Sequence, residues 1–430
     1  MKTNKPFPPI LHGRVVDVPR PEFPTRICVL VEDQMVILQL PSDRASGMSE
    51  KIRLGDLVRI ELEGGNASPP IVEKLAKIGG PPEGRWSEQG DGLRWRRPEA
   101  EQSRMSFLRQ RHKIIREIRT YFDEQGFVEV ETPTWVVAPN PEPQFDVVPA
   151  GEGHLITSPE FHLKRLLVGG MEKIYRLGPV FRGAEVGQHH NPEFTLLEWY
   201  RAHEGLESMS VDLEAICARV APFMLEEVNQ GIPKAVLEGG KFPQRPVAEL
   251  FTEYLGLNLQ GVTTVAGLRD SLITGIKTGA LEPGLPSPED LPEVFEQAFF
   301  MLWDKLETRF PPTPLLVTEW PAPLASLARL KPEDPTVALR MELYAGGLEL
   351  ANGFDELTDA VEQRQRFEAD ITARQEAGLP QVKLDEKFLA ALEQGMPPAA
   401  GMALGIDRLV MLLTGATHIR QVLPFDFDER

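Results

Sequence analysis

Short stretches of alternating apolar and polar residues dominate the first eighty positions of the chain. Residues 11–18 alternate, residues 26–31 and 35–40 are rich in β-branched and aliphatic side chains, and residues 57–62 follow a Leu54-Gly55-Asp56 step typical of a turn. Alternation with a period of two is the pattern of a strand with one buried face. Five or so such strands between residues 10 and 78 predict a small β-barrel.

From about residue 104 the apolar period lengthens, and helical and extended patterns mix. A helix is predicted over about residues 107–125, and the segments that follow read as strands, loops and helices without a regular order. The predicted pieces are two strands joined by a polar loop over 181–200, apolar helical patterns at 211–225 and 291–306, two strands around Gly346-Gly347 over 340–356, a polar helix at 362–375, and a strand of small residues leading into a helix over 401–411. Strands and helices without βαβ alternation favour an α+β domain, in which an antiparallel sheet is flanked by helices.

These patterns predict two domains and a linker. Residues 1–78 form the β domain, residues 79–103 begin Gly-Gly-Pro-Pro and continue as a polar, charged linker, and residues 104–430 form the larger domain, with a helical insertion at about 205–310.

Composition narrows the class of protein. The chain has 430 residues, 42% of them hydrophobic, and it contains no apolar run long enough to cross a membrane. Its N-terminus lacks the apolar core of a secretory signal. The two cysteines, Cys28 and Cys217, have no metal-binding spacing. We therefore expect a cytoplasmic protein with no membrane partner.

The negative charge is concentrated in the larger domain. The net charge is −18; residues 1–100 carry 15 Lys+Arg and 14 Asp+Glu, whereas residues 101–430 carry 31 and 50, a balance of −19. Because nucleic-acid affinity depends largely on neutralising phosphates, such a domain is a poor surface for RNA.

Two arginines and one phenylalanine point to a nucleotide site without a P-loop. Arg182 begins the polar loop of the 181–200 segment, Phe194 lies on the returning strand, and Arg408 follows the small-residue strand near the C-terminus. Arginine presents a fixed fork of donors to phosphate, and an aromatic ring can cover a purine. Glu342 and Glu349 flank the Gly-Gly turn, and their spacing alone favours two solvated strand carboxylates over a metal site.

The segments at 181–200 and 401–411 resemble motifs 2 and 3 of the class II aminoacyl-tRNA synthetases, and residues 126–133 resemble motif 1. Within that class the lysine branch is most similar, on Ser158-Pro159-Glu160, on residues 190–194 and on residues 349–357. Three ordered motifs are far more specific than any one of them. The resemblance implies a class II synthetase-like antiparallel sheet flanked by helices, an OB-like barrel before it, use of ATP and Mg²⁺, and a homodimer.

The resemblance also implies roles for individual residues. Arg182 and Arg408 are the expected catalytic cations. ATP would be bound by Arg182, Glu185, His190, Asn191, Phe194 and Arg408. Lysine or a lysine isomer would be bound by Ser158, Glu160, Tyr200, Asn352, Glu356 and Ala403. Glu342 and Glu349 would hold Mg²⁺.

Some residues depart from the lysyl-tRNA synthetase pattern. Ala184 stands where motif 2 usually has glutamate, with Glu185 next to it, and Ala403 stands where glycine is usual. Residues 195–203 resemble more closely the elongation factor P lysyl/β-lysyl ligases, a paralogous family that modifies a protein lysine.

The expected function is therefore ATP-dependent activation of lysine or (R)-β-lysine and its transfer to a lysine of elongation factor P. Two alternatives remain open. One is a lysyl-tRNA synthetase, which the N-terminal barrel favours and for which tRNA would be the acceptor. The other is a non-catalytic regulatory paralogue that binds a nucleotide, which Ala184 keeps open.

Overall fold

The structure is a computed structural model of the chain that describes residues 8–17, 25–31, 34–43, 52–63, 69–80, 104–224 and 237–427. Residues 81–103, most of the predicted linker, lie outside the described part. The contacts divide the chain into two compact units, residues 1–109 and 110–430, and each is considered separately.

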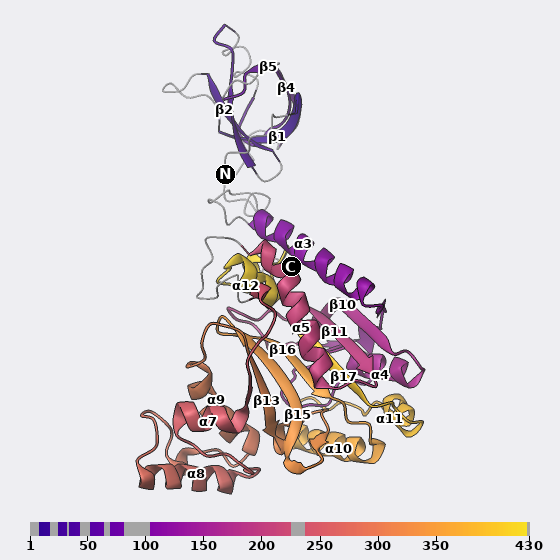
Figure 1. The fold of residues 1–430 in the computed structure, drawn as a ribbon. Helices are drawn as coiled ribbons and strands as arrows, with labels where there is room; N and C mark the ends of the chain where they lie inside the picture. Colours follow the sequence, from indigo (N-terminus) through magenta and orange to yellow (C-terminus); the bar gives the residue numbers. More distant parts are fainter. Residues whose placement is uncertain are drawn as a thin grey trace. The chain divides into compact units, whose positions relative to one another are not determined.

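The first unit is a five-stranded barrel (Figure 1). Its strands run in the order β3-β2-β1-β4-β5, and a parallel bridge from Gln39 to Ile71 joins the two outer strands. This closed order, with an antiparallel β1-β2-β3 meander and a parallel β3–β5 contact, is that of an OB-fold. The bounds are β1 (Ile10–Asp17), β2 (Arg26–Val31), β3 (Gln34–Gln39), β4 (Leu57–Leu62) and β5 (Val72–Gly79). The predicted OB-like barrel is confirmed.

The second unit is built on a nine-stranded sheet in the order β12-β13-β15-β16-β17-β11-β10-β6, with β14 beside β15. The six strands from β13 to β10 are antiparallel, which confirms the predicted antiparallel core, and the two outermost pairs are parallel. The bounds are β6 (Val128–Glu129), β10 (Lys173–Phe181), β11 (Glu193–Ala202), β12 (Gln244–Pro246), β13 (Leu315–Pro321), β14 (Leu330–Lys331), β15 (Asp334–Ala345), β16 (Leu348–Asp355) and β17 (Ala399–Gly405). A small sheet of β7 (Trp135–Val136), β8 (Pro149–Ala150) and β9 (Gly153–Leu155) follows β6.

Helices cover one face of this sheet. They are α3 (Arg104–Glu124), α5 (Leu206–Val220) and α12 (Ile406–Thr414). Helices α3 and α5 cross in front of the strands in Figure 1. Asp212 of α5 accepts hydrogen bonds from Tyr121 of α3 and from Trp199 of β11, at 2.5 and 3.0 Å. These bonds tie two helices to the centre of the sheet. Helix α5, which falls in the predicted insertion, therefore packs on the sheet.

The opposite face carries the polar side chains, because residues two apart on a strand share a face. The strand register aligns one row across five strands: Arg176, Glu198, Ala403, Asn352 and Glu342. The neighbouring row is Tyr200, Gly401, Phe354 and Arg340. Three of the predicted substrate-binding residues and one predicted metal ligand thus lie in two adjacent rows.

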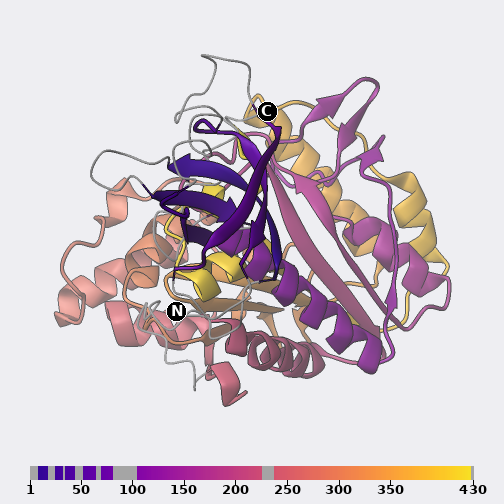
Figure 2. The same cartoon turned by 90° about the horizontal axis from the view of Figure 1, so that it is seen from above.

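The remaining helices form two groups. Helices α4 (Glu160–Val168), α10 (Ala360–Glu376) and α11 (Glu386–Glu393) pack together through Phe161, Phe367 and Phe388. Helices α7 (Val247–Leu255), α8 (Val265–Thr278) and α9 (Phe295–Glu307) form a group beside the β13 end of the sheet, as both views show (Figures 1 and 2), and share a core that includes Trp303 and Trp320.

No helix in the described ranges has the length and apolar character of a membrane span. Cys28 and Cys217 are both buried and unpaired.

Candidate active site

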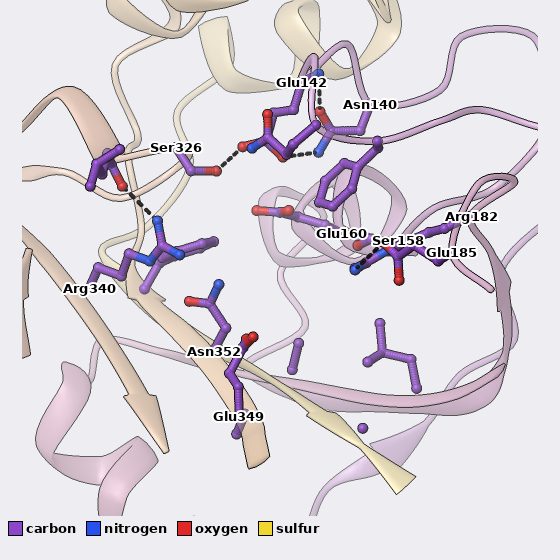
Figure 3. Close-up of a pocket in the computed structure, with 18 of the residues that line it drawn as sticks. Asn140, Glu142, Ser158, Glu160, Arg182, Glu185, Ser326, Arg340, Glu349 and Asn352 are labelled. Carbon is purple, nitrogen blue, oxygen red and sulfur yellow. Dashed lines mark hydrogen bonds and ion pairs between the residues drawn. The ribbon is translucent and has the colours of Figure 1, made fainter. Parts of the chain in front are cut away.

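A single cavity of about 790 Å³ lies against the polar face of the large sheet (Figure 3). It brings together residues from both motif-like segments and from the 340–356 hairpin. The predicted site residues that line it are Arg182, Glu185, His190, Asn191, Phe194, Ser158, Glu160, Asn352, Ala403, Glu349 and Arg408. Tyr200, Glu356 and Glu342 are buried next to it and do not line it.

Arg182 lies between two aromatic rings at one side of the cavity. Its guanidinium carbon is 4.3 Å from the ring centroid of Phe145 and 5.1 Å from that of Phe194. Its Nη1 lies 3.5 Å from Glu185, and its buried Nε has no hydrogen-bond partner among the described residues. The two aromatic rings contact the faces of the guanidinium group and hold it in place, while its N–H donors at the edge remain available to an anion.

Arg408 lies at another side, held by groups from the loop and the hairpin. Its Nη1 donates to the carbonyl of Glu349 at 2.8 Å, and its Nη2 lies 2.6 Å from Nε2 of His190. Burial lowers the pKa of His190, and the nearby Arg408 charge lowers it further. A neutral His190 accepts a hydrogen bond from Arg408 without adding a charge beside the guanidinium.

A buried clamp fixes the start of α12 and therefore the backbone next to Arg408. Asp407 accepts a hydrogen bond from the backbone nitrogen of Thr195 at 2.7 Å and pairs with Arg111 of α3. Arg111 also donates to Oγ1 of Thr195 at 2.8 Å. The clamp joins α3 to β11 and to the start of α12, and sequence reasoning missed it.

The two predicted metal ligands have different surroundings. The side chain of Glu349 is 41% exposed, lines the cavity and has one oxygen 3.7 Å from Arg408. Glu342 is buried, pairs with Arg340 and accepts a hydrogen bond from the Tyr344 hydroxyl at 2.6 Å. Burial raises the pKa of Glu342 to about 7, against the effect of Arg340.

The inner end of the cavity is lined by carboxyl and amide groups. Ser158 donates to Glu198 at 2.7 Å and accepts from the backbone nitrogen of Glu160 at 3.0 Å. Burial raises the pKa of Glu198 to about 8, and the nearby Glu160 charge adds to this. The buried Oδ1 of Asn352 has no hydrogen-bond partner among the described residues. A buried polar atom without a partner beside a cavity is the arrangement expected where a ligand donates.

Behind this end lies an ion pair that sequence reasoning missed. Lys164 of α4 is fully buried, and its Nζ lies 2.6 Å from Glu160 and 2.6 Å from Glu356. Tyr200 and Glu356 both face Gly401, where an added Cβ would lie 2.3 Å from Cε1 of Tyr200. Glycine at this position makes room for both side chains.

Two of the missed residues had a readable position in the sequence. Glu198 precedes Tyr200 by two residues on one strand, so the two must share a face. Lys164 follows Glu160 by four residues on a helix, so the two are neighbours. Phe145 lies in a loop, and no sequence pattern placed it beside Arg182.

This geometry was compared with known proteins. The family model described as tRNA synthetases class II (D, K and N) matches residues 93–429. The chain belongs to this family. The matched range begins after the barrel and includes every side chain of the cavity described above.

Three curated relatives share one name, elongation factor P–(R)-β-lysine ligase. The protein from Vibrio cholerae serotype O1 is 37% identical over 342 residues, which are 75% of this chain and 96% of the relative. The proteins from Haemophilus influenzae and Edwardsiella ictaluri are 38% and 37% identical and cover the same 75% of this chain and 95% of their own lengths. About a quarter of this chain has no counterpart in these alignments.

Proposed function

We propose that this enzyme uses ATP to activate lysine or (R)-β-lysine and then transfers it to a lysine side chain of elongation factor P. One observation carries the proposal: a single cavity joins cationic side chains suited to phosphates with a carboxyl-lined end suited to ammonium groups. The shared name of the relatives supports the acceptor and the amino acid.

The reaction has two balanced steps. The carboxylate of the amino acid attacks the α-phosphorus of ATP, and pyrophosphate leaves. The neutral amine of the acceptor lysine then attacks the carbonyl carbon of the adenylate, so that an amide bond forms, AMP leaves and the amine loses a proton. Donors placed in advance at Arg182 and Arg408 stabilise the charge that develops on the phosphates.

The residues present fit ATP with Mg²⁺. The ring of Phe194 is available to cover the adenine, and Arg182, whose Nε has no partner among the described residues, lines the cavity. Mg²⁺ is commonly held by one or two carboxylates together with the phosphates of the nucleotide. The exposed carboxylate of Glu349 fits that role, whereas Glu342 already has two donors and would have to exchange one of them. When bound, the ion would neutralise phosphate charge.

The amino acid would lie at the inner end. Glu160 and the free oxygen of Asn352 suit the amine near the carboxylate, and Glu356 with Tyr200 suits the distal ammonium. Ala403 lies between Glu198 and Asn352 in the register, where its methyl limits the space for the backbone of the amino acid.

The barrel favours one alternative acceptor. OB-folds commonly bind oligonucleotides, and the relatives leave about a quarter of this chain unmatched. Charging of lysine tRNA is therefore the second candidate. The −19 balance of residues 101–430 weighs against it.

We further infer a homodimer in the cytoplasm. Val128, Trp135 and Val137, which follow the motif 1 helix, are 50%, 47% and 54% exposed and supply apolar surface for a second copy. The proposed acceptor is a translation factor, which is consistent with a cytoplasmic enzyme.

ATP–pyrophosphate exchange tests the activation step. We expect exchange that depends on lysine or (R)-β-lysine, and its loss in Arg408→Ala. Absence of exchange with either isomer in the wild-type enzyme would favour the non-catalytic paralogue. Parallel reactions with elongation factor P and with lysine tRNA would separate the two acceptors.

A further inference from the structure

Lys164 lies at a point where two carboxylates converge behind the cavity. It follows Glu160 by one turn of α4, and Glu356 comes directly after β16. Its side chain is 0% exposed and that of Glu356 is 1% exposed, and each Nζ–oxygen distance is 2.6 Å. Both carboxylates are those proposed to receive ammonium groups of the amino acid.

The ammonium of Lys164 is charged in this setting. Burial acts to lower the pKa of Lys164, but Glu160 and Glu356 outweigh burial and raise it. A buried ammonium is retained only where carboxylates of good geometry compensate for the lost hydration. Lys164 therefore keeps its charge through its two carboxylate partners.

The local charge count leaves room for a ligand cation. Two carboxylates and one ammonium carry a net charge of −1. One oxygen of Glu356, Oε1, faces Tyr200 and Gly401 and has no hydrogen-bond partner among the described residues. Glu160 also lines the cavity. The ammonium of Lys164 thus contacts both carboxylates, while Glu160 lines the cavity and Oε1 of Glu356 keeps an unused acceptor beside Tyr200.

We propose that Lys164 is a positioning residue, whose fixed ammonium holds Glu160 and Glu356 in the orientation that binds the ammonium groups of the amino acid. The proposal rests on the proposed function of the cavity. Without the ammonium, two buried carboxyl groups this close cannot both stay ionised, and one takes up a proton. A neutral acid binds an ammonium more weakly than a carboxylate does.

Other charged and titratable groups lie around the ion pair of Lys164 with Glu356 and affect the pKa of Glu356. Burial acts to raise the pKa of Glu356, while the charge and the hydrogen bond of Lys164 lower it. The charged and titratable groups near the pair are Glu160 on α4, Asp355 and Glu356 at the end of β16, Glu198 and Tyr200 on β11, Arg176 on β10, and Glu142 in the loop before β8. Removing Lys164 removes the cation that contacts both carboxylates.

The test is Lys164→Met, which keeps the length of the side chain and removes its charge. We expect the KM for the amino acid in pyrophosphate exchange to rise at least tenfold, while the KM for ATP stays within twofold of wild type. The pH at which amino-acid binding reaches half its maximum should rise by about one unit. Lys387→Met, on the exposed side of α11, is the matched control and should leave both constants unchanged.

A double-mutant cycle separates electrostatics from packing. In a Glu356→Gln background one carboxylate is already uncharged, so Lys164→Met should raise the amino-acid KM less than threefold. An equal rise in both backgrounds would make Lys164 a packing residue and overturn the proposal. So would an unchanged or lower amino-acid KM in the single variant.

A second variant keeps the proposal testable if Lys164→Met does not fold. Lys164→Arg retains the charge, so the proposal expects the pH midpoint for amino-acid binding to stay within about half a unit of wild type. A midpoint shifted by one unit or more would contradict it. Absence of exchange in the wild-type enzyme would instead overturn the proposed function.

Discussion

Gly401 makes room for the innermost part of the proposed amino-acid pocket, so Gly401→Ala is a direct test of how that pocket is built. An added Cβ would lie 2.3 Å from Cε1 of Tyr200 and 2.5 Å from Oε1 of Glu356. Tyr200 is 4% exposed and Glu356 is 1% exposed, so neither can move into solvent. The clash must shift the tyrosine ring, the carboxylate or the paired strands.

Overpacking of this kind costs about 1–3 kcal/mol of stability. The displaced groups are those proposed to bind the distal ammonium, whereas Arg182 and Arg408 do not contact Gly401. We therefore expect the KM for the amino acid to rise on the order of tenfold, which corresponds to about 1.4 kcal/mol. The KM for ATP should stay within about twofold.

Urea unfolding and pyrophosphate exchange measure the two effects separately. Gly405→Ala, on the same strand, is the control for stability. Its nearest neighbours would be the Leu350 carbonyl oxygen at 3.7 Å and Arg408 Cβ at 4.0 Å, and its φ of −73° suits alanine. We expect the control to change stability by less than about 0.5 kcal/mol. A Gly401→Ala enzyme with a wild-type KM for the amino acid would refute this reasoning.

Three further predictions follow from the site. Arg182→Ala and Arg408→Ala should each reduce exchange ~100-fold, the effect of removing one preorganised donor, without lowering the unfolding midpoint; near-normal exchange would mean that the nucleotide lies elsewhere. Ala403→Gly removes the methyl group between Glu198 and Asn352, and we expect it to move the preference from (R)-β-lysine toward α-lysine by roughly 1–3 kcal/mol in relative kcat/KM. If the ratio of the two kcat/KM values does not change, Ala403 has no role in selectivity. Burial raises the pKa of Glu198 from 4.5 to about 8, so the folded state holds a proton on this side chain that the unfolded state releases. The free energy of unfolding therefore falls as the pH rises between these two values, by up to about 1.4 kcal/mol per pH unit. Glu198→Gln should flatten the fall of Tm between pH 5 and 8, and an unchanged slope would contradict the assignment.

The fold was largely predictable because each unit follows a simple period. Residues 26–31 were predicted as a strand and form β2, and the turn at Gly346-Gly347 separates β15 from β16 as predicted. Helices α5 and α9 overlap the apolar helical patterns predicted at 211–225 and 291–306. Helix α5 falls in the predicted insertion and packs on the sheet, which apolar period alone does not specify.

Most of the residues that line the cavity were predicted from the sequence, but the contacts that join distant segments around it were not. Eleven of the fourteen predicted site residues line it. The pair of Lys164 with Glu356 and the clamp of Asp407 with Arg111 join segments far apart in the sequence. Such contacts depend on how α3, α4 and the sheet pack, and no local pattern encodes that packing.

The central claim is that this chain attaches a lysine isomer to a protein acceptor. Intact-mass spectrometry of elongation factor P, incubated with the enzyme, ATP, Mg²⁺ and each lysine isomer, tests it most directly. The account predicts a mass increase of one lysyl residue on a single side chain, greatest with (R)-β-lysine and absent with Arg408→Ala. An unmodified factor alongside efficient charging of lysine tRNA would contradict it.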